Sequence, residues 1–210
     1  MLMLAESSAF YASYVALWVL VFGLALLVLL VYRHFGLSAL GTLEGVQRDG
    51  LAVGEEAREI TGVDADGKSF VWVPGVPTFL LFAAPECQPC AEVLPSVNRL
   101  AEVGPRLDLA VLAVVAGAGE SATRMREKYR LRFPVTAEDG GEIFGDYRVR
   151  VTPFAFVIGE DGRVRAKGLC NSVSRIHDLL EAGGMEALAQ EVAREFAPND
   201  AALAAVEGAA

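Results

Sequence analysis

A continuous apolar run in the middle of the chain leads to two closely spaced cysteines. The run extends from Pro77 to Ala83 (PTFLLFA), and the cysteines are Cys87 and Cys90. A strand that is apolar at every position is typical of the centre of a sheet covered on both faces. Apolar residues then recur at helical spacing over 87–103. The cysteines therefore lie where a buried strand gives way to a helix, which restricts the fold to a layered α/β class.

The flanking segments predict an alternation of strands and helices. Asp66-Gly67 is a turn signal between two short strands, so a hairpin is expected over 60–73. Further strands are predicted over 107–116, 133–137, 154–158 and 164–169, and helices over 121–131, 141–147, 173–182 and 185–196. Pro95 should kink the helix over 87–103, because proline lacks the internal donor. We expect a central mixed sheet with helices on both faces.

The first 33 residues predict a membrane anchor. No charged residue lies between Glu6 and Arg33, and 14–31 is almost wholly aliphatic or aromatic. A spanning helix needs about 20 apolar residues, often with interfacial aromatic residues at its ends. A cleaved signal peptide is the alternative, but the apolar run is too long, no basic region precedes it and no small-residue cleavage site follows promptly. We expect an uncleaved single-pass helix.

The segments outside the predicted domain set its organisation. Residues 34–59 read as a Gly-rich spacer, 60–196 as the domain, and the Ala-rich residues 197–210 as a disordered tail. Arg33, His34 and Arg48 follow the anchor, and this weak positive charge would place the domain in the cytoplasm. The cysteine chemistry below favours the extracytoplasmic, periplasmic side, and we adopt that orientation.

The place of the cysteines predicts their chemistry. A thiolate is the attacking species in disulfide exchange, and unpaired N–H groups at a helix N-terminus stabilise it, so the pKa of Cys87 should be lowered. Two intervening residues, Gln88 and Pro89, let Cys90 close a disulfide with Cys87 and release a substrate from a mixed disulfide. A structural disulfide or half of a zinc site are the alternatives, and a zinc site would have to recruit Cys170 and His177, whose spacing fits no usual pattern. Cys170 reads as a small buried core residue or a third exchanging thiol, and His177 as a surface or half-buried histidine.

These features together resemble the thioredoxin superfamily over residues 60–183. The resemblance rests on the strand ending in Cys-x-Pro-Cys, the helix broken by Pro95, and Thr152-Pro153 before a late strand. It implies that Pro153 is cis and packs beside the cysteines, and that the backbone of Thr152 pairs with substrate. The chain is also similar, nearly end to end, to membrane-anchored extracytoplasmic thioredoxins of the methylamine utilisation (MauD) type. That likeness implies a role in forming or sorting disulfides of an exported client protein, such as the methylamine dehydrogenase small subunit.

Two positions depart from ordinary thioredoxins. Glu86 replaces the tryptophan before the first cysteine, and its carboxylate should oppose formation of a thiolate at Cys87. Leu81 replaces the buried aspartate, so that proton acceptor is missing. The resemblance implies a general cytochrome-maturation reductase or a thiol peroxidase as alternatives within the same fold. A metal-binding chaperone or a non-catalytic adapter is the alternative of another class.

The net charge and the absence of known binding motifs exclude several classes of partner. The net charge of −9 disfavours nucleic acid, and no glycine-rich nucleotide loop or His-Glu-x-x-His motif is present. We expect no metal site and no cofactor, because the disulfide itself holds two electrons. The expected partners are the exported client, a membrane redox protein that resets the cysteines, and the bilayer. The basic residues over 124–132 are expected to spread round a solvated helix surface without forming a patch.

Overall fold

The computed structural model describes residues 14–28, 49–64 and 66–194. The chain divides into two compact units, 1–45 and 46–210. In the first unit, residues 14–28 form a helix. No helix among the described residues is long and apolar enough to cross a membrane. The predicted anchor lies partly outside the described residues, as do most of the predicted spacer and the predicted tail.

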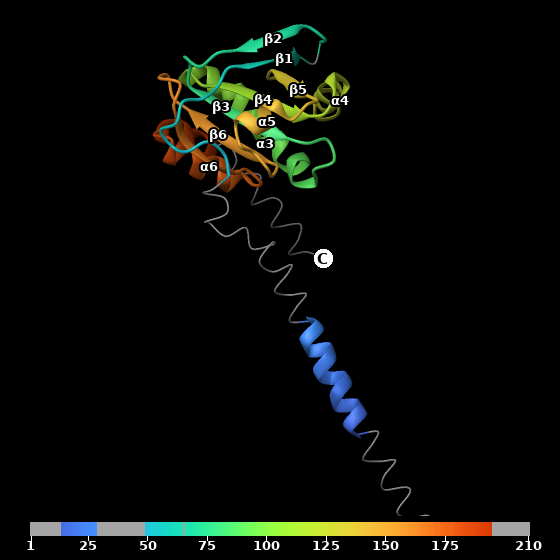
Figure 1. The fold of residues 1–210 in the computed structure, drawn as a ribbon. Coiled ribbons are helices and arrows are strands. Elements are labelled where there is room, and N and C mark those ends of the chain that lie inside the picture. Colours follow the sequence, from blue (N-terminus) through green and yellow to red (C-terminus); the bar gives the residue numbers. More distant parts are fainter. Residues whose placement is uncertain (1–13, 29–48, 65, 195–210) are drawn as a thin grey trace, which may run out of the picture. The chain divides into compact units, whose positions relative to one another are not determined.

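The second unit is built on one seven-stranded mixed sheet (Figure 1). The strands are β1 (Ile60–Asp64), β2 (Ser69–Trp72), β3 (Thr78–Ala83), β4 (Ala110–Ala116), β5 (Val135–Glu138), β6 (Phe154–Ile158) and β7 (Val164–Leu169). Their order across the sheet is β2-β1-β5-β4-β3-β6-β7. Strands β3, β4 and β5 run parallel, and β1, β2, β6 and β7 pair antiparallel with their neighbours. The predicted mixed sheet is confirmed, with the strand before the cysteines near its centre.

The helices follow the predicted order. They are α3 (Gln88–Val103), α4 (Gly119–Tyr129), α5 (Glu142–Asp146) and α6 (Val173–Ala182), with a short 3-10 helix η1 (Gly104–Leu107) after α3. A further helix covers 186–194. The strand predicted to begin at Leu107 begins instead at Ala110. The chain first makes the 3-10 turn, and Asp108 caps that turn in the left-handed conformation at φ 53°.

Alternate residues of β3 face two separate apolar cores. Phe79, Leu81 and Ala83 pack with α3, α4, α6 and the helix over 186–194. Leu80 and Phe82 pack on the other face with α5 and the aromatic residues of β6. All six residues of β3 are buried, as the unbroken apolar run predicted. Because both faces are covered, the strand holds its carboxyl end in a fixed position, and the cysteines follow that end.

The folded unit begins before the predicted boundary at Ile60. Leu51 is completely buried and Ala57 is 5% exposed in the core that contains β6. The N–H of Gly50 donates to the carbonyl of Arg148 at 2.9 Å. The Lys167 ammonium also donates to the carbonyl of Asp49 at 2.7 Å. Residues 49–59 are therefore part of the domain rather than of a spacer.

Candidate redox site

Cys87 and Cys90 form a disulfide at the start of α3. Their Cα atoms lie 5.2 Å apart. Cys87 is the N-cap residue of the helix, and its Sγ accepts a hydrogen bond from the N–H of Cys90 at 3.2 Å. Cys87 is half-buried, whereas Cys90 is completely buried. Since the helix-capping position directs the Cys90 N–H at Cys87 Sγ, this sulfur is the one suited to carry negative charge and to meet a substrate.

The two residues between the cysteines suit the first turn of the helix. Pro89 occupies one of the positions whose N–H has no partner within the helix, so its missing donor costs nothing there. The Gln88 amide donates from Nε2 to Glu92 Oε1 at 3.1 Å on the exposed side of the turn. Both residues are exposed. The predicted site residues Gln88 and Pro89 therefore form the outer surface of the redox turn.

The Thr152–Pro153 peptide bond lies on the β6 side of the redox turn. This bond is cis, as the resemblance implied. Phe82 of β3 pairs with Phe154 of β6, so Pro153 lies next to the end of β3. Pro153 is buried and Thr152 is half-buried. The structure therefore brings the two predicted parts of the site, the cysteines and Thr152–Pro153, to the same end of the central strands.

Cys170 contacts the segment that holds Pro153 and is a buried free thiol. Its N–H donates to the carbonyl of Pro153 at 2.9 Å. Its side chain is completely buried in the core that also contains Cys90. Burial raises the pKa of the Cys170 thiol to about 12. The interpretation of Cys170 as a small buried residue is confirmed, and its position against Pro153 was not predicted.

The other residues singled out in the sequence take ordinary structural roles. Leu81 is completely buried in the core. Glu86 is exposed directly before Cys87. His177 is half-buried on α6, with Nδ1 3.9 Å from Asp178 and 4.0 Å from Glu181. Among the described residues, no three His, Cys, Asp or Glu side chains gather as a metal site would require.

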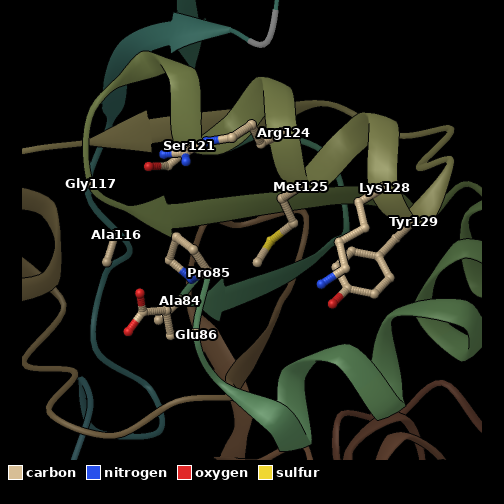
Figure 2. A pocket seen from close by; sticks show the side chains of 10 residues that line it. All are labelled: Ala84, Pro85, Glu86, Ala116, Gly117, Ser121, Arg124, Met125, Lys128 and Tyr129. Carbon is tan, nitrogen blue, oxygen red and sulfur yellow. The ribbon is translucent and has the colours of Figure 1, made fainter.

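Sequence reasoning missed a hollow beside the redox turn. It has a volume of about 600 Å³ and lies between the segment Ala84–Glu86 and helix α4. Figure 2 shows Met125, Lys128 and Tyr129 pointing from α4 toward that segment. The only sequence signal was the spacing of Arg124 and Lys128, four residues apart, which places both on one face of a helix. Nothing in the sequence indicated which segment that face would meet.

Comparison with known proteins gives one matching family. The model of the AhpC/TSA family matches residues 53–167, which include both cysteines and the Thr152–Pro153 bond. The methylamine utilisation protein MauD of Paracoccus versutus is 30% identical over 182 residues, which cover 81% of this chain and 87% of that protein. The thiol-disulfide oxidoreductase ResA of Bacillus cereus is 30% identical over 123 residues, covering 57% of this chain and 71% of ResA.

Solved structures agree with this fold. A putative thiol:disulfide interchange protein DsbE from Chlorobium tepidum superposes with a TM-score of 0.59 at 22% identity. The match covers 66% of this chain and 99% of that one. A putative protein disulfide isomerase from Bacteroides thetaiotaomicron gives a TM-score of 0.54 at 19% identity. At these identities the likeness supports the thioredoxin-like architecture alone.

Proposed function

The chain belongs to the AhpC/TSA family of thioredoxin-like proteins and is a thiol–disulfide oxidoreductase, and we propose that Cys87 and Cys90 carry its chemistry on an exported client protein. The observation that supports this most is the disulfide at the N-cap of α3. It joins one sulfur at the domain surface to one in the core. Such an arrangement suits a first, exposed attack and a second, protected one.

The reaction proceeds in two exchanges. The Cys87 thiolate attacks a sulfur of the client disulfide, so that a Cys87–client disulfide forms and one client thiolate leaves. Cys90 then attacks Cys87 Sγ, which closes the Cys87–Cys90 disulfide and releases the second client thiolate. Two electrons pass from the enzyme to the client. Run in reverse, the same steps oxidise a client dithiol.

The surrounding residues have supporting roles in this proposal. Gln88 and Pro89 hold the first turn of α3, and the backbone beside Pro153 offers a place where an extended client segment pairs next to Cys87. The disulfide stores the electrons, so the reaction needs no cofactor. A membrane redox protein that exchanges with the same cysteines resets the pair.

We further propose that the domain works outside the membrane, held by the N-terminal segment. The apolar run over 14–31 supports an anchor by its length and lack of charge. The relatives named methylamine utilisation protein MauD support a client in methylamine dehydrogenase maturation. The relatives named ResA support the alternative of a more general disulfide reductase.

Trapping tests the proposal and identifies the client. In Cys90→Ala the resolving thiol is missing, so the full-length chain expressed in its host should accumulate a mixed disulfide at Cys87, seen as a reductant-sensitive shift on a gel. Mass spectrometry of the adduct should identify the methylamine dehydrogenase small subunit; apocytochromes would indicate the general reductase instead.

The matched control is the double variant Cys87→Ser with Cys90→Ala, which should give no adduct. Equal adducts from the double variant, or none from the single one, would contradict the role of Cys87. Labelling of Cys87 by a membrane-impermeant thiol reagent, after a membrane-impermeant phosphine has reduced the Cys87–Cys90 disulfide in intact cells, tests the side of the membrane. Protection of Cys87 until the cells are opened would refute the extracytoplasmic orientation.

A further inference from the structure

The hollow beside the redox turn is lined by the segment that leads directly to the attacking cysteine. One wall is the segment Ala84–Glu86, and Cys87 is the next residue of the chain. Ala116 at the end of β4 and Gly117 directly after it also line the hollow, and α4 forms the facing wall (Figure 2). A protein segment joined to Cys87 by a disulfide would therefore have its neighbouring residues within reach of this hollow.

The lining of the hollow is mostly apolar. Met125 is 3% exposed and belongs to the main core, and Tyr129 packs against the same core. Pro85 lies on the facing wall and is exposed. An apolar side chain of a partner that entered this space would lose contact with water and pack against these groups, which is favourable.

Two basic residues of α4 line the same hollow. Arg124 and Lys128 are exposed and one helical turn apart, so both lie on the face toward the redox turn. The Lys128 ammonium lies 5.1 Å from the centroid of the Tyr129 ring. Glu86 supplies one opposing charge on the other wall. The other basic residues over 124–132 spread as expected, since Arg126 pairs with Asp66 and Arg132 with Glu102. Arg124 and Lys128 alone give the α4 side of the hollow two positive side chains.

The hollow and the cis-proline loop lie on opposite sides of β3. Strand β4 pairs with β3 on one edge and leads into the hollow. Strand β6 pairs on the other edge and begins after Pro153. An extended segment that passes the proline loop and reaches Cys87 would continue over the hollow.

We propose that this hollow binds the residues next to the partner cysteine and selects a large apolar side chain accompanied by an acidic one. The apolar side chain fills the space between Pro85 and Met125. The carboxylate pairs with Arg124 or Lys128. This proposal rests on the proposed function, because it concerns the polypeptide whose cysteine forms the mixed disulfide with Cys87.

Synthetic peptides test the selection directly. Each peptide carries one cysteine joined by a disulfide to thionitrobenzoate, and the full-length Cys90→Ala chain in detergent is the reactant. Attack by the Cys87 thiolate forms the Cys87–peptide disulfide and releases thionitrobenzoate, whose colour gives the rate. A peptide with Phe and Asp beside its cysteine should react about tenfold faster than one with Ala and Lys. Added salt should reduce the share of this rate increase that comes from Asp.

Variants separate the two contributions. Combining Arg124→Glu with Lys128→Glu should reverse the preference between Asp and Lys peptides. Ala116→Phe fills part of the hollow and should remove the preference for Phe over Ala. Arg106→Glu is the charge control, because Arg106 lies in η1 before the opposite end of β4, and it should leave both preferences unchanged. Rates are normalised to reaction with 2-hydroxyethyl disulfide, which is uncharged and carries no apolar side chain.

The outcomes distinguish this inference from the proposed function. Equal rates for all peptides, with normal reaction toward 2-hydroxyethyl disulfide, would overturn the selection and leave the exchange chemistry standing. A change of preference in Arg106→Glu as large as that in the α4 variant would also overturn it, because the effect would then be general charge. Absence of reaction with every disulfide would instead refute the proposed function.

Discussion

The start of α3 and the end of β7 both hold a cysteine, but the sulfur atoms of Cys87 and Cys170 differ in exposure and in redox state. Cys87 caps a helix, is half-buried and is oxidised with Cys90. Cys170 is a free thiol with no exposed surface, and its pKa is raised to about 12 by burial. The Cys170 N–H donates to the carbonyl of Pro153, and β6, which follows Pro153, pairs with β3, the strand that leads to Cys87. Reactivity therefore depends on local solvation and helix position rather than on closeness to the site.

The largest expected effect comes from replacing the attacking sulfur. Cys87→Ser should lower the rate of disulfide exchange by at least about a thousandfold, because a serine hydroxyl is not ionised at neutral pH. Cys170→Ala should keep the rate within about twofold if the buried thiol takes no part in exchange. The measurement is reduction of a model protein disulfide by the full-length chain. Comparable losses in the two variants would break the comparison and make Cys170 a partner in exchange.

Alkylation probes the same contrast without a change to the chain. In the reduced protein at neutral pH, iodoacetamide should modify Cys87 readily and Cys170 at least about a hundredfold more slowly, because burial denies access and the high pKa keeps the thiol protonated. Peptide mass mapping after timed labelling gives both rates. Addition of denaturant should make the two rates similar. Rapid native labelling of Cys170 would show that the end of β7 opens to solvent.

The sequence predicted the local elements around the two cysteine regions, but not the contacts between segments that are distant in the chain. The bounds of β6, β7 and α6 match the predicted ranges because their apolar periodicity is local and ends in clear turn or cap residues. The burial of Leu51, the contact of Cys170 with Pro153 and the hollow against α4 were not predictable. Each depends on which segments the strand order brings together, and neither spacing nor hydropathy contains that order.

The next effect in size is the pH dependence of stability at alkaline pH, which should differ between the wild type and Cys170→Ala. A thiol whose pKa rises from 9.0 in the unfolded chain to about 12 in the folded one holds its proton more tightly when folded. Its contribution to stability is complete below pH 9 and decreases as the pH rises toward 12. The free energy of unfolding should thus fall with pH more steeply than in Cys170→Ala, by up to about 1.4 kcal/mol per pH unit. Denaturant titrations of both oxidised proteins measure this, and parallel curves would contradict it.

The smallest expected effect concerns the charge beside the exposed sulfur. Glu86→Gln removes a carboxylate next to Cys87, which favours the Cys87 thiolate and with it the reduced form, so the reduction potential should become less negative. Because Glu86 is exposed and screened by solvent, the shift should stay below about 30 mV. Equilibration with glutathione buffers measures it. Glu160→Gln is the control. Glu160 is exposed and follows the end of β6 that pairs with the start of β3, whereas the cysteines follow the other end of β3. The reduction potential of this variant should match that of the wild type. A shift in the negative direction would mean that Glu86 assists thiolate formation, and the difference between the two cysteine regions would then depend on more than helix position and solvation.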